Sequence, residues 1–224
     1  MSAVKPILFS APMVRALLDR RKSQTRRALR PQPSRPVFGD GYWYDADACG
    51  RDILDGEPPI TRYAVGDLLW CREAWAKVGD EPDDIHACPD MRVHTYYRAD
   101  AVDPELRRWR PSIFMPRWAS RLTLEVSEVR VERLQDISEA DAPAEGIEKD
   151  FAVGLRDVWG WHDYLRGDEL PKRYYADPRE SFRSLWVSIN GADAWEANPF
   201  VAALTITVHQ VNVDELLRQR AVPA

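Results

Sequence analysis

The chain has 224 residues, 45% of them hydrophobic, and a formal net charge of −5. A chain of this length can bury a sizeable core, but it holds no apolar run of about 18 residues, which excludes a membrane-spanning helix. An acidic total does not favour a broad electrostatic hold on a polyanion. The apolar part of the N-terminus is too short for a signal peptide, so we expect a cytoplasmic protein with three reduced cysteines.

The first part of the chain predicts a strand, a helix and a basic segment. The sequence KPILFS is typical of a short strand, and Ser10 is placed to cap a helix with Pro12 in its first turn. That helix is predicted to end at residues 20–27, RRKSQTRR, in which five of the eight side chains are cationic. The basic segment therefore lies near the helix end or on the extended chain after it.

Further strands and helices follow. Ser138 starts a short helix with Asp141 as its capping-box partner, and a longer helix begins at the cap Asp177 and ends at Gly191. Alternating apolar positions predict strands over 65–76, 120–131 and 199–211. The pattern predicts an α+β fold around a small, mostly antiparallel barrel or sheet, as a single domain over residues 1–224, with insertions at 36–63, 77–100 and 148–176.

The basic segment contains a possible nucleophile and a possible base. A threonine hydroxyl reacts only when a base takes its proton, and a lysine can be that base if burial or nearby cations lower its pKa. Lys22 and Thr25 meet this description, and the carboxylates in motif-like settings that could assist them are Glu73, Glu139 and Glu145. The alternative is a solvated helix end whose cations interact with the helix dipole.

Three stretches, LLDRRKSQTRR, GDLLW and LQDISEADAPAEGI, resemble the ASCH family, a branch of the PUA-like β-barrels that bind RNA and modified nucleosides. The family has a helix ending in G-R-K-T-x-T-x-R, a Gly-Asp turn into a strand, and a helix after an L-x-x-I/L-T/S-x-E lead-in. Arg20 replaces the usual glycine and Ser23 the first threonine. The positions that match are Lys22, Thr25, Arg27, Gly66 and Asp67. The resemblance implies a PUA-like (ASCH) β-barrel with flanking helices, and it looks closest to a longer, phage- or prophage-type subgroup.

One branch of that family hydrolyses the amide of N4-acetylcytidine with a lysine, a threonine and a glutamate. These residues fall on Lys22, Thr25 and Glu145, the last of which lies eight residues after Ile137 of the lead-in. The resemblance implies that Lys22 takes the Thr25 proton, that Thr25 attacks the acyl carbonyl, and that Glu145 orients Lys22 or passes a proton to the leaving amine. Direct attack by water, positioned by Thr25, is the alternative mechanism. Neither mechanism requires a cofactor.

Other residues are candidates for holding the substrate, a modified cytosine nucleoside or a short nucleic acid. Arg26 and Arg27 follow the proposed nucleophile, and an arginine there would also stabilise an oxyanion. Glu73 lies on a predicted strand where it would contact a base edge. Arg117 belongs to WRPSIFMPRW, where interleaved arginines and aromatic residues either stack on bases or cover the core.

Two other functions fit parts of the sequence. A non-catalytic RNA or modified-nucleic-acid binding module would use Lys22, Arg26 and Arg27 to hold phosphate, and a ribonuclease is a further option. His86, Cys88 and His94 lie close together, with Cys71 upstream, but their spacing fits no closed zinc pattern, so we expect no metal.

Overall fold

The computed structural model describes residues 3–33, 35–36, 43–46, 52–53, 61–77, 95–100, 109–151, 159–166 and 173–221. The chain forms two compact units, each built from separate segments: unit 1 comprises Met1–Arg20, Gly66–Val126 and Thr207–Ala224, and unit 2 comprises Arg21–Val65 and Ser127–Ile206. Two strands run from one unit into the other, so the number of independently folding domains stays a prediction. Within the described ranges, no helix has both the length and the apolar character needed to cross a membrane.

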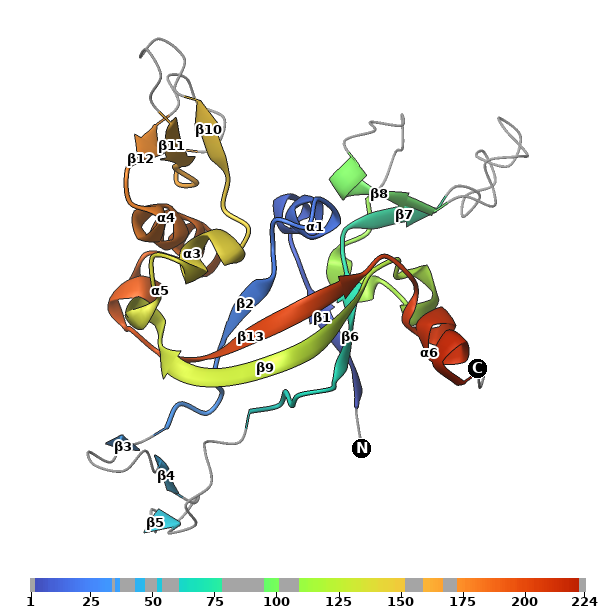
Figure 1. The fold of residues 1–224 in the computed structure, drawn as a ribbon, viewed down its shortest axis with the longest axis horizontal. Coiled ribbons are helices and arrows are strands. Elements are labelled where there is room, and N and C mark those ends of the chain that lie inside the picture. Colours follow the sequence, from blue (N-terminus) through green and yellow to red (C-terminus); the bar gives the residue numbers. More distant parts are fainter. Residues whose placement is uncertain are drawn as a thin grey trace. The chain divides into compact units, whose positions relative to one another are not determined.

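Five strands form the main sheet in the order β1-β6-β9-β13-β2 (Figure 1). Strands β1 and β6 are parallel, whereas β6 and β9, and β13 and β2, pair antiparallel. The strands are β1 (Val4–Leu8), β2 (Gln24–Ala28), β6 (Leu68–Arg72), β9 (Thr123–Arg133) and β13 (Phe200–His209). The prediction of an α+β fold is confirmed.

Strand β13 is buried on both faces over its first half. Phe200, Ala202 and Leu204 are buried as the alternation predicts, but Val201 and Ala203, which point to the opposite face, are buried as well. A strand covered on both sides by packed side chains cannot show a simple alternation of apolar and polar residues.

Unit 1 contains the helices α1 (Ala11–Leu18) and α6 (Val213–Ala221). Ser10 occupies the N-cap of α1, but its side chain makes no capping hydrogen bond, so that part of the prediction is wrong. Gly66 adopts φ +87°, which places Asp67 where its carboxylate accepts a hydrogen bond from the Ala3 amide at 2.9 Å. The predicted strand over 65–76 is interrupted, because its end belongs to a separate pair of strands, β7 (Trp75–Lys77) and β8 (Thr95–Tyr97).

Unit 1 also contains three short 3₁₀ helices. They are η2 (Arg98–Asp100), η3 (Ser112–Phe114) and η4 (Arg117–Ala119). Met115 and Ala119 pack with Trp75 in a small buried cluster.

Unit 2 contains the helices α3 (Asp141–Ala144), α4 (Pro178–Asn190) and α5 (Asp193–Glu196), and the 3₁₀ helix η5 (Leu134–Asp136). The α4 prediction is confirmed: Asp177 accepts a hydrogen bond from the Arg179 amide at 2.8 Å, and Gly191 ends the helix at φ +92°. The two predicted insertions that fall in unit 2 carry small antiparallel sheets. These are β3 (Arg35–Pro36), β4 (Trp43–Ala46) and β5 (Asp52–Ile53), and β10 (Lys149–Phe151), β11 (Trp159–His162) and β12 (Tyr174–Tyr175).

Candidate active site

Backbone pairing brings the basic segment against the end of α3, within unit 2. Lys22 forms an isolated antiparallel bridge with Glu145. The Ser23 amide donates to the carbonyl of Ala144 at 2.8 Å, and the Ser23 carbonyl accepts from the Ile206 amide at 2.9 Å. The chain just before β2 is therefore hydrogen-bonded to the α3 end on one side and to β13 on the other.

The local sequence explains why α3 ends at Glu145. Ser138 Oγ accepts the amide hydrogen of Asp141 at 3.0 Å, which is one half of the predicted capping box. Glu145 is the C-cap residue, and Gly146 follows at φ +86° with its amide donating to the Pro143 carbonyl at 2.9 Å. A left-handed residue directly after the helix turns the chain and fixes the position of Glu145.

Lys22 and Glu145 form a buried pair although 123 residues separate them. Lys22 Nζ donates to the main-chain oxygen of Glu145 at 2.7 Å and to its Oε2 at 2.9 Å. Only 3% of the Lys22 side chain and 5% of the Glu145 side chain are exposed. An uncharged amine has two N–H groups, which match these two acceptors and direct its lone pair to the third tetrahedral position.

Burial lowers the pKa of Lys22 below its ordinary value. Glu145 opposes this shift through its charge and its hydrogen bond, whereas the charges of Arg27 and Arg26 add to it. The net direction is downward, because desolvation is the largest of these effects. A lysine with a lowered pKa can act as a general base closer to neutral pH than an exposed lysine could.

Arg26 is directed at carboxylates of its own unit. Its side chain is 0% exposed. Nε donates to Glu132 at 2.8 Å and Nη1 donates to Glu145 Oε1 at 2.9 Å. Nη2 lies 2.7 Å from Glu132 and donates to Asp141 at 3.2 Å, and Nη1 also reaches Gln24 at 3.3 Å. Four hydrogen bonds engage the guanidinium, so in this structure Arg26 is a buried partner of Glu145, and a substrate contact by Arg26 stays a prediction.

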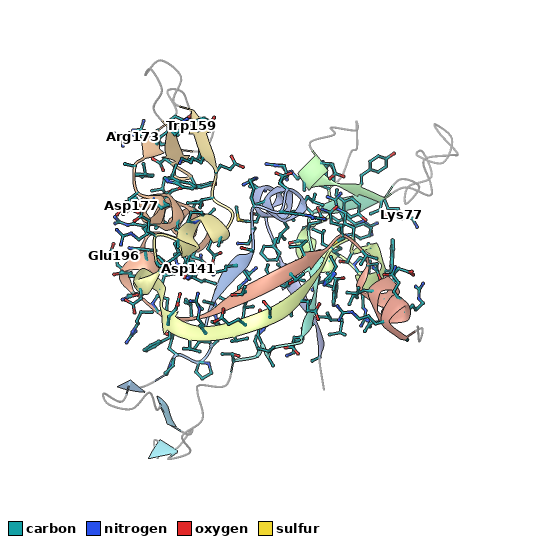
Figure 2. All side chains as sticks on the ribbon, viewed as in Figure 1. Lys77, Asp141, Trp159, Arg173, Asp177 and Glu196 are labelled. Carbon is teal, nitrogen blue, oxygen red and sulfur yellow. The ribbon has the colours of Figure 1, made fainter. Side chains whose placement is uncertain are left out.

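Asp141, labelled in Figure 2, links α3 to the strands. Its carboxylate accepts from Gln24 Nε2 at 2.8 Å and from Arg130 Nη2 at 3.0 Å, in addition to Arg26. The Asp141 side chain therefore holds Arg26 in place, which the capping-box prediction did not anticipate.

Thr25 lies in β2 opposite Leu204 and is 3% exposed. The alternation of side chains along a strand directs it to the face opposite that of Gln24 and Arg26 and places Arg27 on its own face. Within the described part of the chain, the Thr25 hydroxyl makes no hydrogen bond to another residue, Lys22 included.

The other predicted carboxylates differ from Glu145. Glu139 is exposed. Glu73 belongs to unit 1 and is 1% exposed, and its two oxygens accept from Arg121 Nε at 2.9 Å and Arg121 Nη2 at 3.1 Å. Burial raises the pKa of Glu73, although Arg121 opposes the shift. Because Arg121 engages both oxygens, Glu73 forms a buried ion pair in this structure, and a contact with a base edge stays a prediction.

Arg117 also belongs to unit 1. Its Nη2 donates to Asp214 Oδ1 at 2.5 Å, and the two side chains are both part-exposed. Lys22, Thr25 and Glu145 all belong to unit 2. A substrate contact by Arg117 stays a prediction, as does one by Arg27.

Among the residues that the structure describes, no three His, Cys, Asp or Glu side chains group in a way that could hold a metal ion. His86, Cys88 and His94 lie outside those residues, and Cys71 is buried in β6. Comparison of the chain with protein-family models, with curated proteins and with solved structures found no match. The site therefore rests on its own geometry.

Sequence reasoning did not identify Glu132 as a member of this site. Its carboxylate reaches Arg26 from a strand 106 residues away. The only local signal is that charged residues alternate with valines in SEVRVER, which predicts one polar face on that strand.

Proposed function

We propose that this chain is an amidohydrolase that removes an acyl group from the exocyclic amine of an N4-acylated cytosine nucleoside. The buried Lys22–Glu145 pair supports the proposal most strongly, because a desolvated lysine with a lowered pKa that donates two hydrogen bonds to one glutamate is suited to general-base chemistry. The resemblance to the ASCH amidohydrolases, whose PUA-like barrel is part of the proposal, supplies the substrate class.

In the first step, uncharged Lys22 takes a proton from the nucleophile, which forms a bond to the acyl carbonyl carbon. The carbonyl oxygen becomes an oxyanion, and Arg27 or main-chain amides near Thr25 would stabilise it. The tetrahedral intermediate then collapses, the bond between the carbonyl carbon and N4 breaks, and the Lys22 ammonium returns its proton to N4. Glu145 keeps Lys22 oriented in both protonation states, since it accepts hydrogen bonds from an amine or an ammonium.

Thr25 is the proposed nucleophile. Attack by its hydroxyl gives an acyl ester, which a water molecule hydrolyses to release the carboxylic acid and regenerate the hydroxyl. If water attacks directly, Thr25 only holds it in place. Rapid quenching followed by mass spectrometry separates the two mechanisms, because only the first adds the mass of the acyl group to the Thr25 peptide.

The binding-module alternative has less support from the contacts of Lys22 and Arg26. Both side chains are buried and engage Glu145, so holding a phosphate would require them to leave a carboxylate that is itself buried. A module of this kind would lose affinity steeply as salt is raised and would depend little on the Thr25 hydroxyl.

The proposal is tested by incubating the protein with N4-acetylcytidine and following its conversion to cytidine by chromatography. We expect turnover by the intact chain and loss of it in Lys22→Ala and Thr25→Ala, with both variants folded by circular dichroism. Turnover that survives in Lys22→Ala would refute the assigned base, and no turnover with acetyl or larger acyl groups would refute the activity.

A further inference from the structure

We infer that Arg26 is a positioning residue, whose guanidinium fixes the Glu145 carboxylate so that Glu145 holds the Lys22 amine in one orientation. The catalytic consequence of this role rests on the proposed amidohydrolase function. The contacts themselves involve only residues of unit 2.

The two oxygens of the Glu145 carboxylate are divided between two nitrogen donors, Arg26 and Lys22. Oε1 accepts from Arg26 Nη1 at 2.9 Å and Oε2 accepts from Lys22 Nζ at 2.9 Å. Rotating the carboxylate about its last bond would break both hydrogen bonds of a side chain that is only 5% exposed, which is costly. The Arg26 bond to one oxygen therefore decides where the other oxygen lies, and with it the direction of the lysine amine.

Arg26 can fix Glu145 because other carboxylates fix Arg26. Glu132 accepts from its Nε edge and Asp141 from Nη2, so the plane of the guanidinium is set from two sides. Phe182 lies with its ring centroid 5.9 Å from Arg26 Cζ. A lysine at this position would present all its N–H groups from one atom and could not join three separated carboxylates.

Arg26 also contributes to the charge around Lys22. Its charge and that of Arg27 lower the pKa of Lys22, and Glu145 raises it. Among the described residues, other charged groups that take part in this network are Glu132 and Arg130 on β9, Asp141 on α3, and Arg21 with Glu148 beside Gly146. Removing the Arg26 charge is therefore expected to raise the pKa of Lys22, so that the base is available only at higher pH.

The test uses two charge-balanced double variants. Arg26→Met with Glu132→Gln removes the positioning cation together with one of its carboxylates, so the net charge of the site does not change. Arg183→Met with Glu196→Gln is the matched control, since it removes an exposed arginine of α4 and an exposed glutamate of α5 in the same unit, whose side chains lie 3.3 Å apart. Each protein is compared with the parent for kcat, KM and the pH dependence of kcat with N4-acetylcytidine.

We expect the Arg26 variant to lose about 100-fold in kcat, the scale on which misplacing a reacting group by an ångström acts, with KM changed little. The rising limb of its pH profile is expected to move to higher pH. The control is expected to keep the kcat and the pH profile of the parent. Equal losses in the two variants, or an unshifted pH limb in a folded Arg26 variant, would overturn the assigned role.

A second measurement separates this inference from the proposed function. The ¹⁵N resonance of Lys22 Nζ, assigned by its absence in Lys22→Ala, reports the lysine pKa without any substrate. We expect it to titrate at higher pH in the Arg26 variant and unchanged in the control, even if the acyl substrate proves wrong. If the double variant does not fold, Glu132→Gln alone removes an Arg26 partner and must move the titration, and an unmoved titration overturns the inference.

Discussion

Glu145 in unit 2 and Glu73 in unit 1 are both buried glutamates bound by basic side chains, but the side chains that bind them differ. A single arginine, Arg121, engages both oxygens of Glu73, and Asp100 binds the same guanidinium at 2.7 Å. Glu145 instead divides its oxygens between Arg26 and Lys22. Arginine keeps its proton in proteins, whereas a desolvated lysine releases it. Burial alone therefore does not mark a reactive carboxylate, whereas a partner that can exchange a proton does.

The same substitution at both glutamates tests whether this difference in partners matters for activity. Glu145→Gln is expected to lower kcat for N4-acetylcytidine by about 100-fold or more, the usual scale of an acid–base contribution, because Lys22 loses a charged partner. Glu73→Gln is expected to leave the rate per folded molecule unchanged. Equal losses at the two positions would show that the difference in partners carries no functional meaning.

The second substitution tests the unit 1 pair as a structural element. Arg121→Met leaves Glu73 buried without its cation, and breaking a buried pair in this way costs about 3–5 kcal/mol of unfolding free energy. Urea denaturation followed by circular dichroism measures the loss. Adding Glu73→Gln should restore part of that stability, since the orphaned charge is then removed. A loss below about 1 kcal/mol for Arg121→Met would place this pair with exposed salt bridges, which contribute little.

Glycine at the end of α3 provides a smaller effect. Gly146→Ala forces an alanine to φ +86°, which costs about 1–2 kcal/mol and shifts the chain next to Glu145, so we expect both stability and activity to fall. Gly191→Ala is the matched control. Gly191 has φ +92° and an added Cβ would meet nothing within 4 Å, so only stability should fall there. A Gly146→Ala protein with full activity would contradict the fixed position of Glu145.

Lys22 in unit 2 and Glu73 in unit 1 are expected to change the free energy of unfolding in opposite directions as pH rises. Each group contributes at most about 1.4 kcal/mol per pH unit. The pKa of Lys22 is lowered, so between that value and 10.5 the unfolded chain binds more protons and stability rises with pH. The pKa of Glu73 is raised, so between 4.5 and its raised value the native chain binds more protons and stability falls with pH. Urea titrations across pH should lose the first slope in Lys22→Met and the second in Glu73→Gln. Slopes that persist in these variants would assign them to other groups.

The smallest expected effect is at Arg20, which stands where the resembled family has glycine. Arg20 has φ +58°, a conformation that costs a side-chain-bearing residue about 1–2 kcal/mol. Arg20→Gly removes this cost but makes the unfolded chain more flexible, so we expect a net gain of about 0.5–1 kcal/mol. Thermal unfolding measures it, and a destabilised variant would mean that the Arg20 side chain makes a contribution larger than the strain.

The parts of this fold that the sequence predicts well are those with local signals. Helix α4 has its cap, its proline and its terminal glycine within one stretch, and the structure confirms them. The short strands of the insertions were not predicted, because strands of two to four residues depend on their pairing partners rather than on their own pattern. Ser10 was predicted as a cap from residue type alone, and residue type does not fix the side-chain direction.

In the candidate site, too, the residues with local sequence signals were predicted and those without them were not. Lys22 and Glu145 were identified from two short motifs that the family resemblance linked. In the structure a backbone bridge between these two residues joins the motifs. The role of Arg26 was not predicted, since its partners come from β9 and α3, more than a hundred residues away. A guanidinium in a basic stretch looks like a binding group until the carboxylates that surround it are known.

In the proposed mechanism an uncharged Lys22, held by Glu145, is the base that drives amide hydrolysis. The most direct test is the pH dependence of cytidine release from N4-acetylcytidine by the intact protein and by Lys22→Ala. For the intact protein we expect a rate that rises with pH through one ionisation below the ordinary lysine pKa. We expect Lys22→Ala to lose both the activity and this rise with pH. A rate with the same pH limb in Lys22→Ala, or no release of cytidine by the intact protein, would contradict it.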